Sequence, residues 1–154
     1  MIVKTVTRLV SGFILAFGIY TVLFGHLTPG GGFAGGAIIA LAFVLLMLAY
    51  GKEEAMERLS ESASSMLDST GALIFLVVAL LGFSAPYWVP GEVGYFFRNF
   101  LGKGRYFELL SSGTIPINNI AIGLKVGVSV FAVLLGLSIF RHVSSESEAE
   151  GEEE

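Results

Sequence analysis

Hydrophobic residues fall into four long, almost unbroken stretches, separated by segments in which polar residues gather. The stretches run from about 9 to 26, 33 to 50, 71 to 89 and 117 to 140. Each is long enough for a helix that crosses the hydrocarbon core of a bilayer, which takes about 17–25 residues. Strands of a membrane barrel would be shorter and would alternate in hydrophobicity. The pattern therefore predicts an all-α integral membrane protein with four transmembrane helices.

The first stretch follows Lys4 and Arg8, as the apolar region of a secretory signal follows basic residues. It is longer than such a region, three further stretches follow it, and Phe24-Gly25-His26 is a poor cleavage site. We therefore expect the first span to be retained.

Composition agrees with a membrane protein. Of the 154 residues, 54% are hydrophobic and 14% are charged, whereas a soluble domain has about 25% charged residues. The absence of cysteine excludes disulfides, thiolate metal sites and cysteine nucleophiles. Six of the thirteen acidic residues lie in the last nine positions, so the net charge of −4 belongs to the tail. The other charges are nearly balanced, which disfavours a nucleic-acid-binding protein.

Four crossings place both termini and the segment 51–70 on one side of the membrane. That side carries five basic residues and the other side three, so the positive-inside rule predicts cytoplasmic termini in the cell membrane. We expect a membrane domain over 1–143 and a disordered acidic tail over 144–154.

The two longer connections have patterns of their own. Residues 52–68 have a helical rhythm, which either extends the second helix or lies on the membrane surface, and Ser69 and Thr70 are suitable N-caps for the third helix. The outer connection, about 90–116, is rich in aromatic residues. These form either an interfacial belt or a docking surface for another membrane subunit.

The first connection is the most unusual local sequence. Pro29 biases Thr28 away from helical angles, and the next three residues, Gly30, Gly31 and Gly32, permit a tight reversal. Inside the second helix, Gly35 and Gly36 allow another backbone to approach closely. The segment is either a sharp turn with close packing or a ring of amides that binds an anion or orders water.

His26 ends the first span at the outer interface. It is either a hydrogen-bonded polar anchor or part of a proton relay, because histidine changes charge near neutral pH.

Lys125 is the one charged residue inside a predicted span. It lies about 12 Å along the helix axis from Ile117, so reaching the outer surface would strain the side chain. Ionisable residues within spans are candidates for functional sites. A polar or small stripe surrounds it on the same helix face: Asn118, Ala121, Ser129, Ala132 and Gly136. This face is typical of the lining of a path, although a lysine that snorkels to the interface is the simpler interpretation.

The opposite face of that helix carries Gly123 and Gly127, a pair suited to close packing of another helix. The predicted spans contain no carboxylate to neutralise Lys125. We therefore expect its partner to be water, a carbonyl group or an acidic residue of another subunit.

Several chemistries are excluded. His26 and His142 are expected at opposite membrane faces, too far apart to hold a haem between them. No cluster of residues indicates a metal site or a hydrolase, so we expect no cofactor, no metal and no catalytic activity in this chain alone.

Two segments carry a resemblance to a known family. They are the turn from Gly25 to Gly36 and the stretch Asn119-Ile120-Ala121-Ile122-Gly123-Leu124-Lys125-Val126-Gly127. Together they resemble the MnhB family, small membrane components of the multisubunit Mrp-type sodium/proton antiporters. The resemblance covers residues 5–142, and related subunits occur in membrane-bound hydrogenases and similar archaeal respiratory complexes.

The resemblance implies an accessory subunit that contributes to the ion path and to subunit contacts, with other membrane subunits, lipid, sodium and protons as its partners. It matches His26 and Lys125 to polar positions of the family, and Asn118, Asn119 and Ser129 extend the set of ion-path candidates. Two functions compete: a subunit whose polar residues line a hydrated path, and a structural subunit that positions its neighbours. An independent four-helix channel is a third, weaker possibility.

Overall fold

The computed structural model describes part of the connecting segments and nearly all of the helices. The described residues are 2–51, 60–84, 87, 91, 93–101, 104–105 and 108–151, with the side chains of 61, 139 and 141–151 excluded. Within them the chain forms α1 (Ile2–Phe24), α2 (Gly31–Tyr50), α4 (Glu61–Phe83) and α5 (Ile115–Gly151), with no strand. All four helices contain a segment long and apolar enough to cross a membrane, as the sequence predicted.

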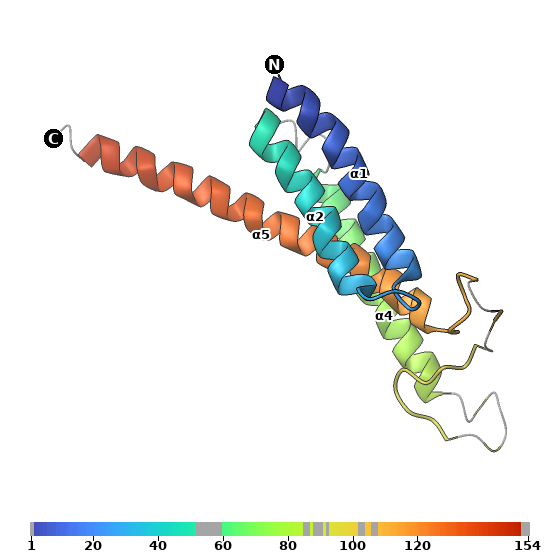
Figure 1. The fold of residues 1–154 in the computed structure, drawn as a ribbon. Coiled ribbons are helices and arrows are strands. Elements are labelled where there is room, and N and C mark those ends of the chain that lie inside the picture. The colour runs from blue at the N-terminus through green and yellow to red at the C-terminus, as the bar shows by residue number, and fades with distance from the viewer. Residues whose placement is uncertain are drawn as a thin grey trace.

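Helices α1 and α2 form an antiparallel pair joined by the glycine-rich turn (Figure 1). Helix α5 crosses the other helices at a steep angle, and its C-terminal part stands clear of them (Figure 1). It contacts α2 and α4 extensively and α1 to a smaller extent. At the far end of the α1–α2 pair, the Tyr50 hydroxyl donates a hydrogen bond to the Lys4 carbonyl oxygen at 2.7 Å. Helix α5 thus contacts each of the other three helices, while α1 packs mainly on α2.

Glycines bring α2 directly against α5. A methyl group placed on Gly36 would lie 2.8 Å from the Gly123 carbonyl oxygen and 3.1 Å from the Gly127 amide nitrogen. Gly35 faces the other neighbour, α1, where the same addition would lie 2.8 Å from the Val22 amide nitrogen. Gly123 and Gly127, predicted as a packing pair, thus lie where α2 approaches α5 closely, and we call this contact the glycine seam. Below the seam, Ala40 and Phe131 form a buried apolar cluster.

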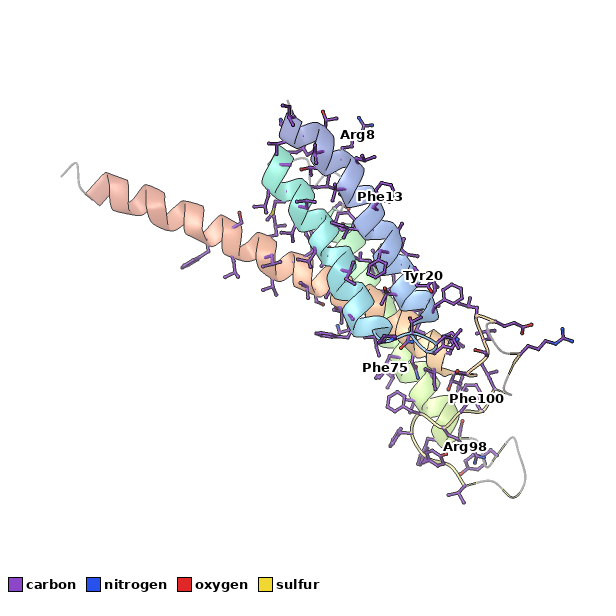
Figure 2. The ribbon with its side chains drawn as sticks, in the orientation of Figure 1. Arg8, Phe13, Tyr20, Phe75, Arg98 and Phe100 are labelled. Atoms are coloured by element: carbon purple, nitrogen blue, oxygen red, sulfur yellow. The ribbon has the colours of Figure 1, made fainter. Side chains whose placement is uncertain are left out.

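Apolar side chains also cover the outside of the bundle. Phe13 and Tyr20 point away from it along α1 and are 70% and 48% exposed (Figure 2). Such a surface is expected where a helix faces lipid or another membrane subunit rather than water.

The third helix differs most from the prediction. It was expected over about 71–89, with Ser69 or Thr70 as its cap, but α4 begins at Glu61. Its actual N-cap is Ser60, whose hydroxyl accepts a hydrogen bond from the Ala63 amide. The polar residues of the first turns lower the hydropathy there without interrupting the helix. The helix ends at Phe83, and its C-cap is Ser84, whose amide donates to the Leu80 carbonyl oxygen.

Helices α1 and α5 also have ends that differ from the predicted ones. Helix α1 begins at Ile2, before the predicted residue 9, because Lys4 and Arg8 fit in a helix although they lower its hydropathy. Helix α5 continues as far as Gly151, into the segment 144–154 that the sequence analysis set apart as a tail. The segment contains no proline, and its glutamates and alanine favour the helix. A helical pattern was predicted over 52–68. Residues 52–59 lie outside the described residues, and residues 61–68 belong to α4.

The glycine seam makes a testable prediction. Gly36→Ala would force α2 away from α5, because the added methyl group meets the Gly123 backbone. Overpacking of this kind destabilises by about 1–3 kcal/mol. We therefore expect a lower melting temperature and less folded protein after detergent extraction.

The matched control is Gly136→Ala on α5, where an added methyl group would meet nothing within 4 Å. It makes the same chemical change and should leave the melting temperature unchanged or slightly higher. Equal melting temperatures for the two variants would contradict the seam.

Candidate functional site

Lys125 has a partner within its own chain. Its ammonium nitrogen lies 2.8 Å from Oδ1 of Asp68, on α4. The Ser129 hydroxyl, one turn further along α5, donates a second hydrogen bond to the same oxygen, also at 2.8 Å. We call these three residues the charged cluster. Within it, Asp68 neutralises the charge of Lys125 and Ser129 adds a hydrogen bond.

This pairing corrects the expectation that Lys125 has no carboxylate partner among the spans. Asp68 was assigned to the cytoplasmic connection because the third helix was expected to begin at residue 71. Since α4 begins at Glu61, Asp68 lies inside it and within the segment Ser62–Phe83, which is long and apolar enough to cross a membrane. An acidic residue of another subunit is therefore not needed to neutralise Lys125.

A glycine allows α4 to approach this part of α5. A methyl group placed on Gly71 would lie 2.7 Å from the Ala121 carbonyl oxygen and 3.2 Å from Cβ of Lys125. Gly71 follows Asp68 by three residues, so the two lie about one turn apart on neighbouring parts of the helix surface. Close contact at Gly71 therefore brings Asp68 within reach of Lys125.

The polar stripe predicted on α5 is a packing face over part of its length. Ala121 is fully buried against α4, and Lys125 and Ser129 contact Asp68. Further along, Ala132 and Gly136 are exposed, and a methyl group on Gly136 would meet nothing. Two faces of α5 thus contact other helices, α2 through Gly123 and Gly127 and α4 through the charged cluster.

His26 lies in a second polar site, at the end of the helices where the glycine-rich turn meets the start of α5. Its Nε2 lies 3.0 Å from the Ser111 hydroxyl oxygen, so the two groups form a hydrogen bond. Its Nδ1 is buried and has no partner among the described residues, as is also true of Oδ1 of Asn118. A buried polar atom without a partner is commonly satisfied by ordered water.

The glycine-rich turn is built around this site. Gly30 and Gly31 have φ values of 146° and 82°, which residues with a side chain rarely adopt, and α2 begins directly after Gly30 and Pro29. A methyl group on Gly31 would lie 3.6 Å from the side-chain oxygen of Asn119, and one on Gly32 would collide with the Asn119 carbonyl oxygen. The turn therefore packs against the first turns of α5, which supports the interpretation as a sharp, closely packed turn.

The two polar sites are separate. Lys125 lies ten residues beyond Ile115, the first residue of α5, or about 15 Å along the helix axis. His26 instead contacts Ser111, before that helix begins. Among the predicted ion-path residues, the structure brings Lys125 and Ser129 together at Asp68, and it places His26 and Asn119 at the glycine-rich turn. Asn118 lies in the first turn of α5, where its side-chain oxygen is buried.

Part of the aromatic connection packs on α4. The ring centroids of Phe75 and Phe97 lie 4.6 Å apart, and those of Phe83 and Phe96 lie 5.1 Å apart. Phe97 has a φ of 60°, and the backbone at Arg98 approaches Gly82 so closely that a methyl group there would lie 2.6 Å from the Arg98 nitrogen. Phe75 and Arg98 lie toward this end of α4 (Figure 2). Other aromatic residues in or just before this connection, Trp88, Tyr106 and Phe107, lie outside the described residues.

The chain has four apolar helices of this length, and an ion pair lies at the contact between α4 and α5. These features define a polytopic membrane protein. The chain belongs to the family of domains related to the MnhB subunit of the Na⁺/H⁺ antiporter, whose profile matches residues 2–132.

Individual relatives agree with the family. An uncharacterized protein of Methanocaldococcus jannaschii is 37% identical over 142 residues, which are 87% of this chain and 51% of that protein. The putative antiporter subunit mnhB2 of Staphylococcus aureus strain Newman is 40% identical over 81 residues, 53% of this chain and 57% of that subunit. The chain thus spans about half the length of the curated relatives it matches.

A solved structure is also similar. A chain of the membrane-bound sulfane sulfur reductase, an archaeal respiratory membrane complex, superposes with a TM-score of 0.69 at 31% identity. The match covers 89% of this chain and 57% of that one.

The charged cluster makes a prediction about stability. Lys125→Ala leaves Asp68 without its ammonium partner, and Asp68→Ala leaves Lys125 without its carboxylate. Each single variant therefore leaves an unpaired charge, which the double variant does not. The double variant should lose less stability in detergent than the sum of the two single losses. Thermal unfolding of the wild type and all three variants measures this coupling.

We expect the interaction between Asp68 and Lys125 to stabilise the folded protein, with a coupling energy of the usual size. Directly interacting residues typically show coupling energies of about 0.5–3 kcal/mol. Strictly additive losses would mean that Asp68 and Lys125 do not interact in the folded protein.

Proposed function

We propose that this chain is a small membrane subunit of a multisubunit cation/proton antiporter module, one that exchanges sodium for protons. The observation that carries the proposal is the family match over residues 2–132. One relative is a putative antiporter subunit, and the similar solved chain belongs to a respiratory membrane complex. The host is thus either a dedicated antiporter or a respiratory complex that couples electron transfer to ion transport.

In this proposal the chain is a transporter component and performs no catalysis of its own. Its partners are other membrane subunits, lipid, sodium and protons. The chain lies in the cell membrane with both termini in the cytoplasm, as the distribution of basic residues favours.

The ion-path function rests on the two polar sites. The charged cluster places a carboxylate, an ammonium group and a hydroxyl group inside a membrane span, where polar groups commonly mark ion pathways. The His26 site places an imidazole and a hydroxyl group at the turn, and the buried Nδ1 of the imidazole has no partner among the described residues. We propose Lys125, His26, Asn118, Asn119 and Ser129 as the residues that line or support the path.

A second function is favoured by a specific observation. The Lys125–Asp68 pair joins α5 to α4, and the glycine contacts join α5 to α2, so these residues also serve a purely structural subunit. In that alternative the chain packs between larger antiporter-like subunits and conducts nothing.

The two functions predict different transport phenotypes. Lys125→Ala and His26→Ala in the intact complex should each abolish or strongly reduce sodium-dependent proton exchange in membrane vesicles, while the complex still assembles. Proton exchange is measured by the recovery of a pH-sensitive fluorescent dye after sodium is added.

Assembly is measured on the same membranes by co-purification through a tag on another subunit. Ser65→Ala is a suitable control, because Ser65 is an exposed polar residue of α4 outside both polar sites. If both test variants assemble and exchange normally, the structural alternative replaces the ion path.

A further inference from the structure

An open groove runs along the contact between α4 and α5, beside the charged cluster. Its volume is about 410 Å³, and it is lined by Gly71, Ala72, Phe75 and Leu76 of α4 and by Ile122 and Lys125 of α5, among others. Lys125 is the one charged residue in this lining. The exposed surface of the lining is wholly apolar, so Lys125 contributes its aliphatic stem to the groove, while its ammonium group pairs with Asp68 just outside the lining.

The charged cluster is only partly covered by its own chain. The side chain of Lys125 is 47% exposed and that of Asp68 is 37% exposed, although both residues lie in segments that are long and apolar enough to cross a membrane. Both hydrogen bonds to Asp68 use Oδ1, so Oδ2 has no hydrogen-bond partner among the described residues. An ammonium group has three hydrogen-bond donors, and one of those of Lys125 is used here.

Lipid does not complete such a site. Acyl chains have no hydrogen-bonding groups, and exposed polar atoms in hydrocarbon are costly, so polar residues in spans face protein or a water-filled space. The remaining lining of the groove is apolar and gives ordered water few partners. A helix fits both features, because its apolar side chains fill the groove and one polar side chain can reach the charged cluster.

The charge of the missing group follows from the pair itself. Lys125 and Asp68 neutralise one another, so a further charged residue would leave an unbalanced charge inside the membrane. The residue that completes the site is therefore uncharged, with a hydroxyl or amide group. Of the partners for Lys125 left open by the sequence, which were water, a carbonyl group or an acidic residue of another subunit, this argument disfavours the acidic residue.

We propose that a transmembrane helix of another subunit occupies the α4–α5 groove and hydrogen-bonds to the Lys125–Asp68 pair through an uncharged polar side chain. The proposal rests on the proposed function, in which the chain works within a multisubunit membrane complex. It assigns α4, at the charged cluster, as a subunit interface.

Photo-crosslinking in native membranes tests this interface. A benzophenone amino acid replaces Leu76, which lines the groove, or Val77, the next residue, which does not. The two positions lie at nearly the same depth and are 53% and 43% exposed, so Val77 is a matched control. After irradiation, the whole complex is purified and the adducts are mapped by mass spectrometry.

We expect Leu76 to crosslink to one transmembrane segment of a co-purifying subunit, with a yield several-fold above that of Val77. That segment should carry Ser, Thr, Asn or Gln near the depth of the charged cluster, and no Asp, Glu, Lys or Arg there. Replacing its polar side chain by leucine should lower co-purification several-fold.

Other outcomes overturn the inference. They are lipid adducts alone at Leu76, equal yields at both positions, or a charged residue of the captured segment beside the cluster. Co-purification of the unmodified wild-type chain separates this failure from failure of the proposed function. If the wild type purifies without other membrane subunits, the proposed function fails. If it co-purifies but Leu76 captures only lipid, the groove inference fails alone.

Discussion

The arrangement of the chain depends on how closely other backbones approach α5. Gly36 lets α2 lie against the backbone at Gly123, and Gly71 lets α4 lie against the backbone at Ala121. Close approach through small residues replaces the hydrophobic driving force, which lipid does not supply between helices in a membrane. Once α4 is held in this way, the positions of its polar residues relative to α5 follow.

The most important consequence concerns charge. Asp68 lies one turn before Gly71, so the contact that brings the backbones together also brings a carboxylate to Lys125. The chain therefore carries a neutral pair, and not an isolated cation, within segments that are long and apolar enough to cross a membrane. A neutral pair with exposed hydrogen-bonding atoms favours a polar, uncharged neighbour, and this distinguishes the proposed interface from one built on opposite charges.

The sequence predicted those features that depend on local pattern. Continuous apolar runs indicated the four helices, and the spacing of Gly123 and Gly127 pointed to the helix face that α2 approaches. The partner of Lys125 was missed because the polar residues before Gly71 resemble the end of a span in a hydropathy profile. The sequence did contain a signal for the true start of this helix. Ser60 is a good N-cap, and a helix that begins after it contains Asp68.

Contacts between distant segments could not be predicted in this way. Lys125 and Asp68 are 57 residues apart, and His26 and Ser111 are 85 residues apart. Only the packing of α5 brings either pair together. For the same reason, the candidate ion-path residues form two separate sites in the fold, although the sequence alone treated them as one set.

Reversal of the two charges tests the central claim, that Asp68 neutralises Lys125, most directly. Asp68→Lys and Lys125→Asp are made singly and together, and the amount of the chain in the purified complex is measured for each. Each single reversal places two like charges in contact inside the membrane, so assembly should be lost. The double reversal restores a neutral pair and should recover much of the wild-type amount. A double variant as defective as the worse single variant would contradict the pairing.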